Sequence, residues 1–311
     1  DTVITATAAQ HRQVFAVGDP STDASVAPVS ATNGLGVDNK TANGIAYELN
    51  VKIFNKFSDY FVKHYAIPVV SCVWSSGDGD SLKYPAKHLF EFLNHHGMLE
   101  LGNSPIWKTV VGGSNTYVEA ILALIPNKRM ERVTSVKRFA DYVEVNGERF
   151  DYAIIATHAN AALEILVDAD SEERKNLAAI TYSQNKTVLH KDSSVLPKAT
   201  KARASWNYQM ESCKEASNKV LVSYWMNLLM LLKTNEDYVV TLNGDVASEK
   251  IIATMNYEHP VFTVSAINAA EFLREAGGER LAFAGAHLGW GFHEDGARSG
   301  VNAARKFGAK W

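Results

Sequence analysis

The first regular pattern of apolar residues along the chain begins near residue 53. Ile53, Phe57 and Tyr60 follow one another at intervals of four and three residues, a spacing that places side chains on one face of a helix. We therefore expect an amphipathic helix of roughly a dozen residues here. Pro68 is expected to end it, because proline breaks the helical hydrogen-bond pattern.

Two further helices are predicted by their start and stop signals. Pro85 is favoured in a first helical turn and Gly97 is typical of a helix end, so a helix should connect them. A later apolar run is broken by Gly112 and Gly113, and a helix of about ten residues should follow it and end before Pro126. Helices are also expected over residues 159–167, 264–276 and 295–307.

The strand patterns include one hairpin and one buried strand. Asn146 and Gly147 form a typical two-residue hairpin turn between residues 142–145 and 149–150. Residues 152–156 form a short continuous apolar run, as in buried parallel strands. Because strands, hairpins and helices interleave, we predict the α/β (α+β) class with at least two sheets. Further strands are expected over residues 132–136, 186–190, 203–208, 220–224, 238–242 and 280–284.

Composition narrows the class of protein but does not name a function. Of the 311 residues, 46% are hydrophobic and 21% charged, as in ordinary globular proteins with one large domain or two moderate ones. The net charge of -3 argues against a nucleic-acid surface, and we find no apolar run of the ~20 residues that a membrane span needs. Residues 1–50, rich in small and polar side chains, are expected to form an irregular extension.

The cysteines and the start of the chain leave two questions open. Cys72 and Cys213 lack the spacing of a zinc site, and two buried thiols are favoured over a disulfide between them. No metal site is predicted. The chain begins with Asp1, which is consistent with a trimmed or processed end. A removed targeting segment would point to an organelle, so the compartment stays open.

The most informative segment lies near the C-terminus. A buried strand over residues 280–284 runs into a turn with Gly285, Gly289 and Gly291, followed by the start of a helix. Glycines allow the backbone to approach a ligand closely, and the amides at a helix N-terminus favour phosphate or another anion. The pattern therefore allows a site for phosphate or another anion. On spacing alone, however, a plain strand–turn–helix unit capped by Asp295 is favoured.

This segment, residues 281–300, resembles the C-terminal flavin-binding signature of the amine oxidase and phytoene desaturase superfamily. In that signature an apolar strand ends in Ala-Gly, and a Gly-Ala dipeptide opens the last helix. Residues 107–117, 132–136 and 151–157 resemble further motifs of the superfamily in order and spacing. Within it, residues 65–306 are most similar to predicted NAD/FAD-binding proteins associated with cyclopropane fatty acid synthases. The matching pieces are Pro85–Ala86, Asn94–Gly97, Ala204–Tyr208, Tyr224–Asn227, Tyr257–Pro260 and Gly291–Gly296.

The resemblance implies a Rossmann-like FAD/NAD(P)-binding domain interleaved with a mixed-sheet substrate domain. Residues 107–165 and 280–307 would belong to the FAD-binding part, and residues 51–106 with 166–279 to the substrate part. The implied reaction is hydride transfer from a lipid or other apolar substrate to the flavin, with the cofactor carrying the electronic work. No catalytic residue is identified by the resemblance.

The resemblance also implies which residues contact FAD. The amides of Gly296 and Ala297 would face phosphate or ribityl oxygens, Glu294 or Asp295 would accept a ribityl hydroxyl, and Val136 would cover the adenine. Without a cofactor, the same residues would be ordinary first-turn acids, turn glycines and a core valine. The implied cofactor-binding set is Gly112, Gly113, Val136, Gly285, Ala286, Glu294, Asp295, Gly296 and Ala297.

One departure from the family limits these expectations. Members open with a strand, Gly-x-Gly-x-x-Gly and a helix, whereas Gly34 and Gly36 are followed by Asn39 and are not preceded by an apolar strand. A partner chain that completes the flavin site is one explanation, and removal of that part is another. The third is a non-catalytic accessory or structural subunit that has lost flavin binding. The first and third require a protein partner over the incomplete sheet.

Histidines and aromatic residues supply further candidates. His293, next to Glu294, is the best acid–base candidate among the histidines, but simple packing or solvation is the favoured interpretation. A free-standing protein that binds an apolar ligand is a weaker alternative function. The remaining candidates are His95, His96 and His287 as acid–base groups, and Trp206, Tyr208, Tyr224, Trp225, Trp290 and Phe292 as cavity or core residues.

Overall fold

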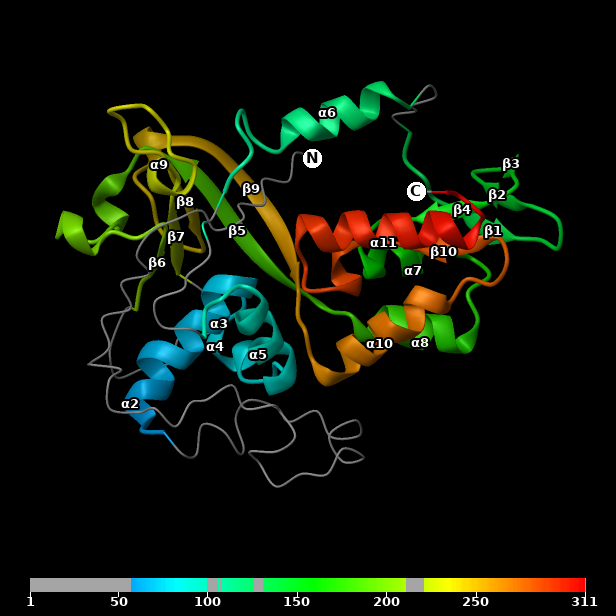
Figure 1. Cartoon of the computed structure of the whole chain (residues 1–311), viewed down its shortest axis with the longest axis horizontal. Helices are drawn as coiled ribbons and strands as arrows, with labels where there is room; N and C mark the ends of the chain where they lie inside the picture. Colours follow the sequence, from blue (N-terminus) through cyan, green and yellow to red (C-terminus); the bar gives the residue numbers. More distant parts are fainter. Residues whose placement is uncertain (1–56, 100–105, 107, 126–130, 211–220, 311) are drawn as a thin grey trace. The chain divides into compact units, whose positions relative to one another are not determined.

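The computed structural model describes residues 57–99, 106, 108–125, 131–210 and 221–310 (Figure 1). The chain forms two compact units, each treated by itself below. The described residues of unit 1 are 110–125, 131–181 and 265–310, and those of unit 2 are 57–109 and 182–264, with the gaps given above. The predicted extension over residues 1–50 and Cys213 lie outside the described residues.

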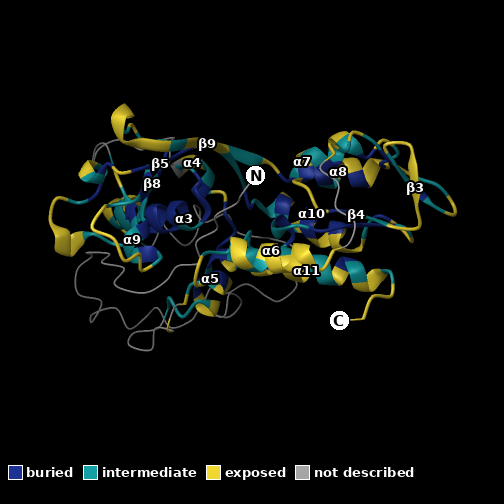
Figure 2. Ribbon diagram, turned by 90° about the horizontal axis from the view of Figure 1, so that it is seen from above, coloured by how far each residue is buried: buried dark blue, intermediate teal, exposed yellow. Residues whose placement is uncertain are grey.

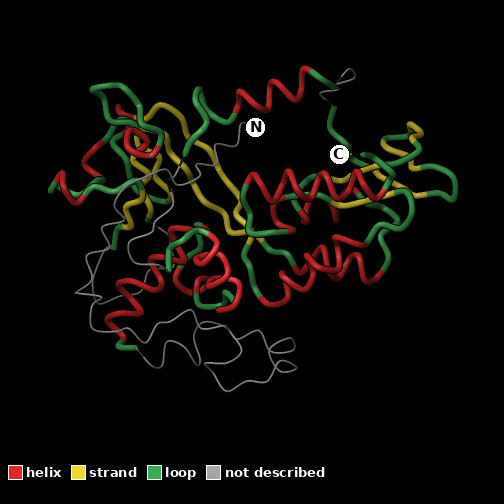
Figure 3. The backbone as a smooth tube through the Cα atoms, viewed as in Figure 1, coloured by secondary structure: helices red, strands yellow, loops and turns green. Residues whose placement is uncertain are grey.

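Unit 2 is built on a five-stranded antiparallel sheet with the strand order β6-β7-β8-β5-β9. Its longest pair joins β5 to β9, visible as the two long strands of Figure 3. Strand β9 was not predicted, although its residues alternate between apolar and polar from Ala253 to Glu258 and this signal would have marked it. The bounds are β5 Tyr182–His190, β6 Trp206–Tyr208, β7 Val222–Trp225, β8 Val239–Leu242 and β9 Ile251–Pro260.

The first helical segment of unit 2 corrects one prediction. The helix does not end at Pro68: α2 (Asp59–Phe61) continues through a π-helical segment, η3 (Val62–Ala66), into α3 (Ile67–Trp74). Proline lacks an N–H and clashes with the carbonyl four residues earlier. The wider π turn in front of Pro68 shifts the hydrogen bonds by one residue and so accommodates the ring.

The second predicted helix of unit 2 is confirmed. Helix α5 (Ala86–His95) follows Pro85, and Gly97 adopts a φ of 62° just after the helix, where a left-handed residue is favourable. The remaining helical elements of unit 2 are α4 Asp78–Ser81, η4 Ser193–Val195, η5 Thr200–Ala202, α9 Met226–Leu229 and η6 Ser248–Lys250.

Aromatic rings form a core of unit 2. The Trp74 ring lies 5.0 Å from the rings of Tyr84 and Phe92, and Phe262 meets Trp74 and Tyr84 edge-on. All four side chains are buried. Offset and edge-to-face contacts between aromatic rings add to the stabilisation from their burial, so this cluster fixes α3 and α5 against the end of β9.

The sheet of unit 2 also contains a buried chain of polar side chains. Thr241 on β8 binds His190 on β5 and Ser223 on β7, with oxygen-to-nitrogen and oxygen-to-oxygen distances of 2.8 Å. All three residues are buried. Buried polar groups are favourable only when they are paired, and here each finds its partner on a neighbouring strand.

Unit 1 contains two small sheets. Strands β1, β2 and β3 form an antiparallel meander, and Asn146 and Gly147, with φ of 49° and 85°, form the predicted hairpin turn. Strand β4 pairs in parallel with β10, as its continuous apolar run predicted. The strand expected over residues 132–136 begins only at Val136. The bounds are β1 Val136–Arg138, β2 Val143–Val145, β3 Glu148–Phe150, β4 Ala153–Ile155 and β10 Leu281–Phe283.

The helices of unit 1 include one that was not predicted. Helix α8 begins with a capping box, in which Asp170 accepts from the backbone of Glu173 and Glu173 from that of Asp170. This signal is present in the sequence and would have marked the helix. The bounds are α6 Asn115–Ala123, α7 Ala159–Ile165, α8 Ser171–Ala179, α10 Val264–Glu275, η7 Ala286–Leu288 and α11 His293–Lys306.

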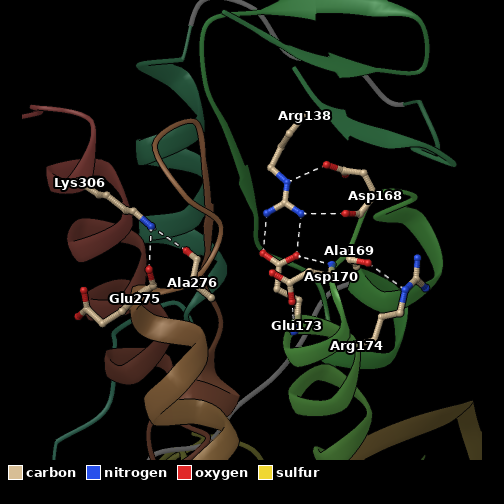
Figure 4. A network of polar contacts seen from close by, with 9 residues as sticks. All are labelled: Arg138, Asp168, Ala169, Asp170, Glu173, Arg174, Glu275, Ala276 and Lys306. Atoms are coloured by element: carbon tan, nitrogen blue, oxygen red, sulfur yellow. Dashed lines mark hydrogen bonds and ion pairs between the residues drawn. The ribbon is translucent and has the colours of Figure 1, made fainter. Parts of the chain in front are cut away.

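A network of ion pairs holds β1 against α8 (Figure 4). The Arg138 guanidinium donates to both carboxylate oxygens of Glu173, at 2.5 and 2.7 Å, and to a carboxylate oxygen of Asp168 at 2.9 Å. Nearby, Lys306 on α11 donates to the carbonyls of Glu275 and Ala276 at the end of α10. A cation at this position satisfies carbonyls that the helix leaves unpaired.

The combination of helices and sheets confirms the predicted α/β (α+β) class. The two units divide the chain at residues 109/110, 181/182 and 264/265, whereas the sequence division falls at 106/107, 165/166 and 279/280. Helix α8 and nearly all of α10 therefore lie in unit 1. No helix within the described residues is long and apolar enough to cross a membrane.

Candidate functional site

The glycine-containing segment after β10, called the glycine bend here (residues 285–292), has the predicted form. Ala284 still donates to Ile155 of β4, after which Gly285 turns the chain with φ 152° and ψ 155° into the short helix η7. The Gly285 amide donates to Ser299 Oγ of α11 at 2.8 Å, and that hydroxyl donates to the Gly296 carbonyl. The bend is thus fastened to the helix that follows it.

Two glycines of the bend are required by the packing of the chain itself. A Cβ added to Gly285 would lie 2.4 Å from the His287 ring, and one added to Gly289 would lie 2.5 Å from a carboxylate oxygen of Asp295. Such distances are far below van der Waals contact. Neither glycine therefore needs a ligand to explain it.

Gly296 and Gly300, one turn apart on α11, are different. A Cβ on Gly296 would meet nothing closer than Ala286, at 3.9 Å, and a Cβ on Gly300 would meet nothing within 4 Å. Glycine inside a helix costs about 0.5–1 kcal/mol relative to alanine, and the described residues supply no packing reason for this cost. The face formed by Gly296 and Gly300 therefore has room for a group from outside these residues.

The start of α11 differs from the prediction. The helix begins at His293, two residues before the expected start at Asp295, so the Gly296 amide donates to the Phe292 carbonyl at 3.1 Å. The amide of Ala297 likewise falls inside the helical ladder. Because the first amides of a helix have no acceptor within it, the amides available to an anion are those of His293, Glu294 and Asp295.

The two acids of this first turn have different environments. The Asp295 side chain is buried, packs against Gly289 and accepts from the Phe292 amide at 3.1 Å. Asp295 is thus the third residue of the helix and bonds back to the N-cap residue, Phe292. The simpler interpretation, in which Asp295 is itself the N-cap, is wrong in position. The Glu294 side chain is 77% exposed and lies 3.5 Å from Arg298. Of the two, only Glu294 faces outward.

Gly112 and Gly113 lie in a turn in front of α6, with φ of 82° and 87°. The carbonyl of Gly113 accepts from the hydroxyl of Thr116 at 2.8 Å, which fixes the first turn of α6. Tyr117 lies four residues after Gly113, and its hydroxyl contacts Nδ1 of His293, the first residue of α11. This contact joins the glycine-pair segment to the start of α11, and sequence analysis did not single out Tyr117.

Val136 is not brought to the glycine bend by its contacts. Its side chain is buried, it pairs with Val145 of β2, and its carbonyl accepts from Val167 after α7 at 3.0 Å. These contacts are those of a core residue in a small sheet. The predicted role at the adenine of a dinucleotide stays a prediction.

The histidines near α11 are poor proton carriers at neutral pH. Burial lowers the pKa of His287 to about 4, and the neighbouring His158 acts in the same direction. Burial also lowers the pKa of His293. Both imidazoles are therefore neutral near pH 7. No cluster of His, Cys, Asp and Glu within the described residues has the arrangement of a metal site, and His95 and His96 lie in unit 2 at the end of α5.

The aromatic candidates divide between the two units. In unit 2, Trp206, Tyr208 and Tyr224 pack against the buried, free Cys72 and against Val222. Burial raises the pKa of Tyr224 to about 12, so its hydroxyl stays protonated. This group has the character of a core. The indole nitrogen of Trp225 donates to Asp237 at 2.9 Å, while Trp290 and Phe292 belong to the glycine bend of unit 1.

Comparison with solved structures shows which fold the chain has. A cyclohexylamine oxidase from Brevibacterium oxydans is similar with a TM-score of 0.55 at 11% identity, over 81% of this chain and 64% of that one. A putrescine oxidase bound to putrescine is similar with a TM-score of 0.53 at 9% identity, over 86% and 68%. The chain has an amine-oxidase fold.

A third structure with this amine-oxidase fold is a CLA-producing fatty acid isomerase from P. acnes. Its TM-score is 0.55 at 16% identity, over 78% of this chain and 63% of that one. The chain therefore spans less than two thirds of the length of the isomerase and of the cyclohexylamine oxidase. A scan against protein-family models and a search of curated protein sequences found no match.

Proposed function

We propose that this chain is the FAD-binding, amine-oxidase-type subunit of an oxidoreductase, and that the flavin dinucleotide lies along the Gly296 and Gly300 face of α11. The observation that carries this proposal is the open space beside these two helix glycines, next to a helix N-terminus that follows a strand of a parallel sheet. In α/β folds, ligands bind at the carboxyl ends of the strands, and β10 ends where the glycine bend begins.

Four features of unit 1 fit a dinucleotide. The amides of His293 and Glu294 and the positive end of the helix dipole would bind a phosphate. The backbone at Gly285 and Ala286 lies at the end of β10, is bonded to α11 through Ser299, and would pass along the cofactor. The exposed Glu294 carboxylate is available to accept a hydroxyl group. The Tyr117 contact with His293 brings the Gly112–Gly113 segment toward the same helix start.

A bound flavin would accept a hydride from the substrate. The described residues of this chain would bind and orient it and exclude water. The neutral imidazole of His293, whose pKa is lowered by burial, would keep the Tyr117 hydroxyl and the start of α11 in a fixed arrangement without adding positive charge. A lipid or another apolar substrate is proposed from the sequence resemblance, because the aromatic cluster of unit 2 packs as a core.

The proposal includes a partner chain that completes the cofactor site. Its support is that the parallel sheet of unit 1 has two strands within the described residues. Parallel sheets occur almost only with both faces covered by further structure. The finer assignment, to proteins associated with cyclopropane fatty acid synthases, stays a prediction from the sequence.

The flavin is tested by absorbance of the purified, unreconstituted protein before and after denaturation. We expect flavin to be released from the wild type and to be missing from Gly296→Asp, in which a carboxylate would enter the phosphate region. Asn302→Asp is the matched control, because it adds the same charge on the exposed side of the same helix. Wild-type flavin content in Gly296→Asp would contradict the assignment.

A second candidate is a non-catalytic accessory subunit with the same fold. It is favoured by helix α6, which has no buried residue and exposes Val118, Ile121 and Leu122 (Figure 2). Such an apolar helix is suited to a protein partner whether or not a cofactor binds. Stable association with a partner in a preparation without flavin would favour this candidate over the first.

A further inference from the structure

The turn that follows β5 in unit 2 is held by the buried carboxylate of Asp192. This side chain is 6% exposed and accepts from the Ser194 amide at 3.1 Å. It also accepts from Lys250 Nζ at 3.0 Å and from the Ala247 amide at 3.4 Å. These contacts join the turn with η4 to the turn with η6, and Asp192, Ser194, Ala247 and Lys250 are called the Asp192 clasp here.

His190 contacts this clasp through a neutral ring. The residue is buried, and its Nδ1 accepts from the Asp192 amide at 3.1 Å. Because a backbone N–H can only donate, Nδ1 carries a lone pair and the ring proton lies on Nε2. Nε2 in turn donates to the Thr241 hydroxyl at 2.8 Å. Both ring nitrogens are therefore engaged, and only one tautomer of the neutral imidazole satisfies both bonds.

A further proton on the ring would break the bond to the clasp. Imidazolium carries an N–H on each nitrogen, so Nδ1–H would face the Asp192 N–H instead of accepting from it. Ring and amide would have to separate, and this amide belongs to the residue whose carboxylate holds the clasp. Within the described residues, the charged groups that face His190 are Asp192, at the end of its own strand, and Lys250, from η6. Its partner on β8, Thr241, is neutral.

We propose that His190 is an acid-sensitive switch, and that a proton on its ring opens the Asp192 clasp. In the open form, the turns with η4 and η6 are released from the end of β5. The sheet itself stays paired, because β5 pairs with β9 through backbone groups over residues 182–189, which protonation of a side chain does not alter. The inference rests on unit 2 and does not depend on the proposed flavin site.

The direction of the pH effect follows from the two forms. In the closed form burial lowers the pKa of His190, the Asp192 carboxylate partly offsets this effect and Lys250 adds to it. In the open form the ring meets solvent and regains an ordinary pKa of about 6.5. The open fraction therefore rises as the pH falls below about 6.5, by up to about tenfold per pH unit. Burial raises the pKa of Asp192, but Lys250 and the amide donors outweigh it and hold this pKa well below its usual range, so the carboxylate stays charged throughout.

Amide exchange of the full chain, followed by NMR between pH 7 and pH 5, tests the switch. After correction for intrinsic exchange rates, the protection of the Asp192 and Ser194 amides should fall at least about tenfold as the pH is lowered. The amides that join β5 to β9 should keep their protection, which distinguishes local opening from unfolding of unit 2. His190→Asn should abolish the pH dependence at Ser194, because its side-chain oxygen can accept from the Asp192 amide but takes up no proton in this range. The control is His88→Phe, which removes a histidine of α5 whose pKa burial also lowers and should leave this dependence unchanged.

The NMR shifts of the ring nitrogens keep the test decisive if His190→Asn does not fold. In the wild type these shifts should show the Nε2–H tautomer of His190 at pH 7. The ring should then gain its second proton over the same pH range in which Ser194 loses protection. An Nδ1–H tautomer, pH-independent protection at Ser194, an equal pH dependence in His190→Asn, or a parallel loss of protection between β5 and β9 would each overturn the proposal.

Discussion

The two units of this chain differ in how extensively the strands of their sheets are hydrogen-bonded. In unit 2 the five strands pair continuously from β6 to β9, and buried side chains such as Thr241 find partners on neighbouring strands. In unit 1 the parallel sheet pairs β4 with β10, and α6 has no buried residue. Buried polar groups are paired in stable proteins, and unit 2 meets this requirement within one five-stranded sheet, whereas the parallel sheet of unit 1 has two strands within the described residues.

The contrast extends to single glycines, some of which are explained by the packing of the chain and others of which have open space beside them. Gly289 is needed because Asp295 occupies the space of its Cβ, whereas Gly300 faces open space. The same residue type on the same segment thus has two different explanations. The predictions below test this difference, beginning with the largest expected effect.

The largest effect is expected where unit 1 depends on its own contacts. Arg138→Met should lower the free energy of unfolding by about 3–5 kcal/mol, because it leaves the Glu173 carboxylate, 3% exposed, without its bidentate partner. Urea denaturation followed by circular dichroism measures this change. Lys175→Met, which removes an exposed ion pair with Glu172, is the control and should change stability by less than about 1 kcal/mol. Equal effects of the two substitutions would show that the Arg138 network adds little.

In unit 2 the buried chain of polar groups should be the sensitive point. Thr241→Val should lower the free energy of unfolding by about 1–3 kcal/mol, because His190 Nε2 and Ser223 Oγ lose their common partner. Thr254→Val, on the exposed side of β9, is the control and should stay within about 0.5 kcal/mol of the wild type. A neutral Thr241→Val would mean that the sheet tolerates unpaired groups.

Acid should destabilise both units through buried histidines. Burial lowers the pKa of His88 in unit 2 and of His287 in unit 1 to about 4. The unfolded chain therefore binds protons that the folded chain does not, and stability falls as the pH drops from 6.5 toward 4. Well inside that window the slope is about 1.4 kcal/mol per pH unit for each histidine. Urea midpoints of His88→Phe should show a shallower pH dependence than the wild type, and an identical dependence would contradict the buried, neutral imidazole.

The smallest effect on stability is expected at the proposed cofactor face. Gly296→Ala should raise the free energy of unfolding by about 0.5–1 kcal/mol, since alanine favours a helix and its Cβ meets only Ala286 at 3.9 Å. The same substitution should lower flavin content, which absorbance would report. Gly289→Ala should instead lower stability, because its Cβ would collide with Asp295. Thermal unfolding of the two variants therefore distinguishes an open face from a packed one.

Sequence patterns located most elements, but helix α8 and strand β9 were missed and the end of one helix was placed at Pro68. The hairpin at Asn146–Gly147 and the strand–bend–helix near the C-terminus are local, and both appear as predicted. Strand β9 was missed although residues 253–258 alternate between apolar and polar, and only the structure shows that it pairs with β5 along its length. Pro68 lies inside a continuous helical segment because the π turn before it accommodates the proline ring. The spacing of apolar residues does not predict such a turn.

For the candidate site, the sequence determined which residue types were present, and the tertiary structure decided what each one does. The glycines and acids of the bend follow from the sequence, as does the likeness to flavin enzymes that they carry. Only the packed structure shows that Asp295 turns inward under Gly289 while Gly296 and Gly300 face open space. The physical reason is that glycine permits close approach without specifying what approaches, so its neighbours in space, which the sequence does not state, give it its role.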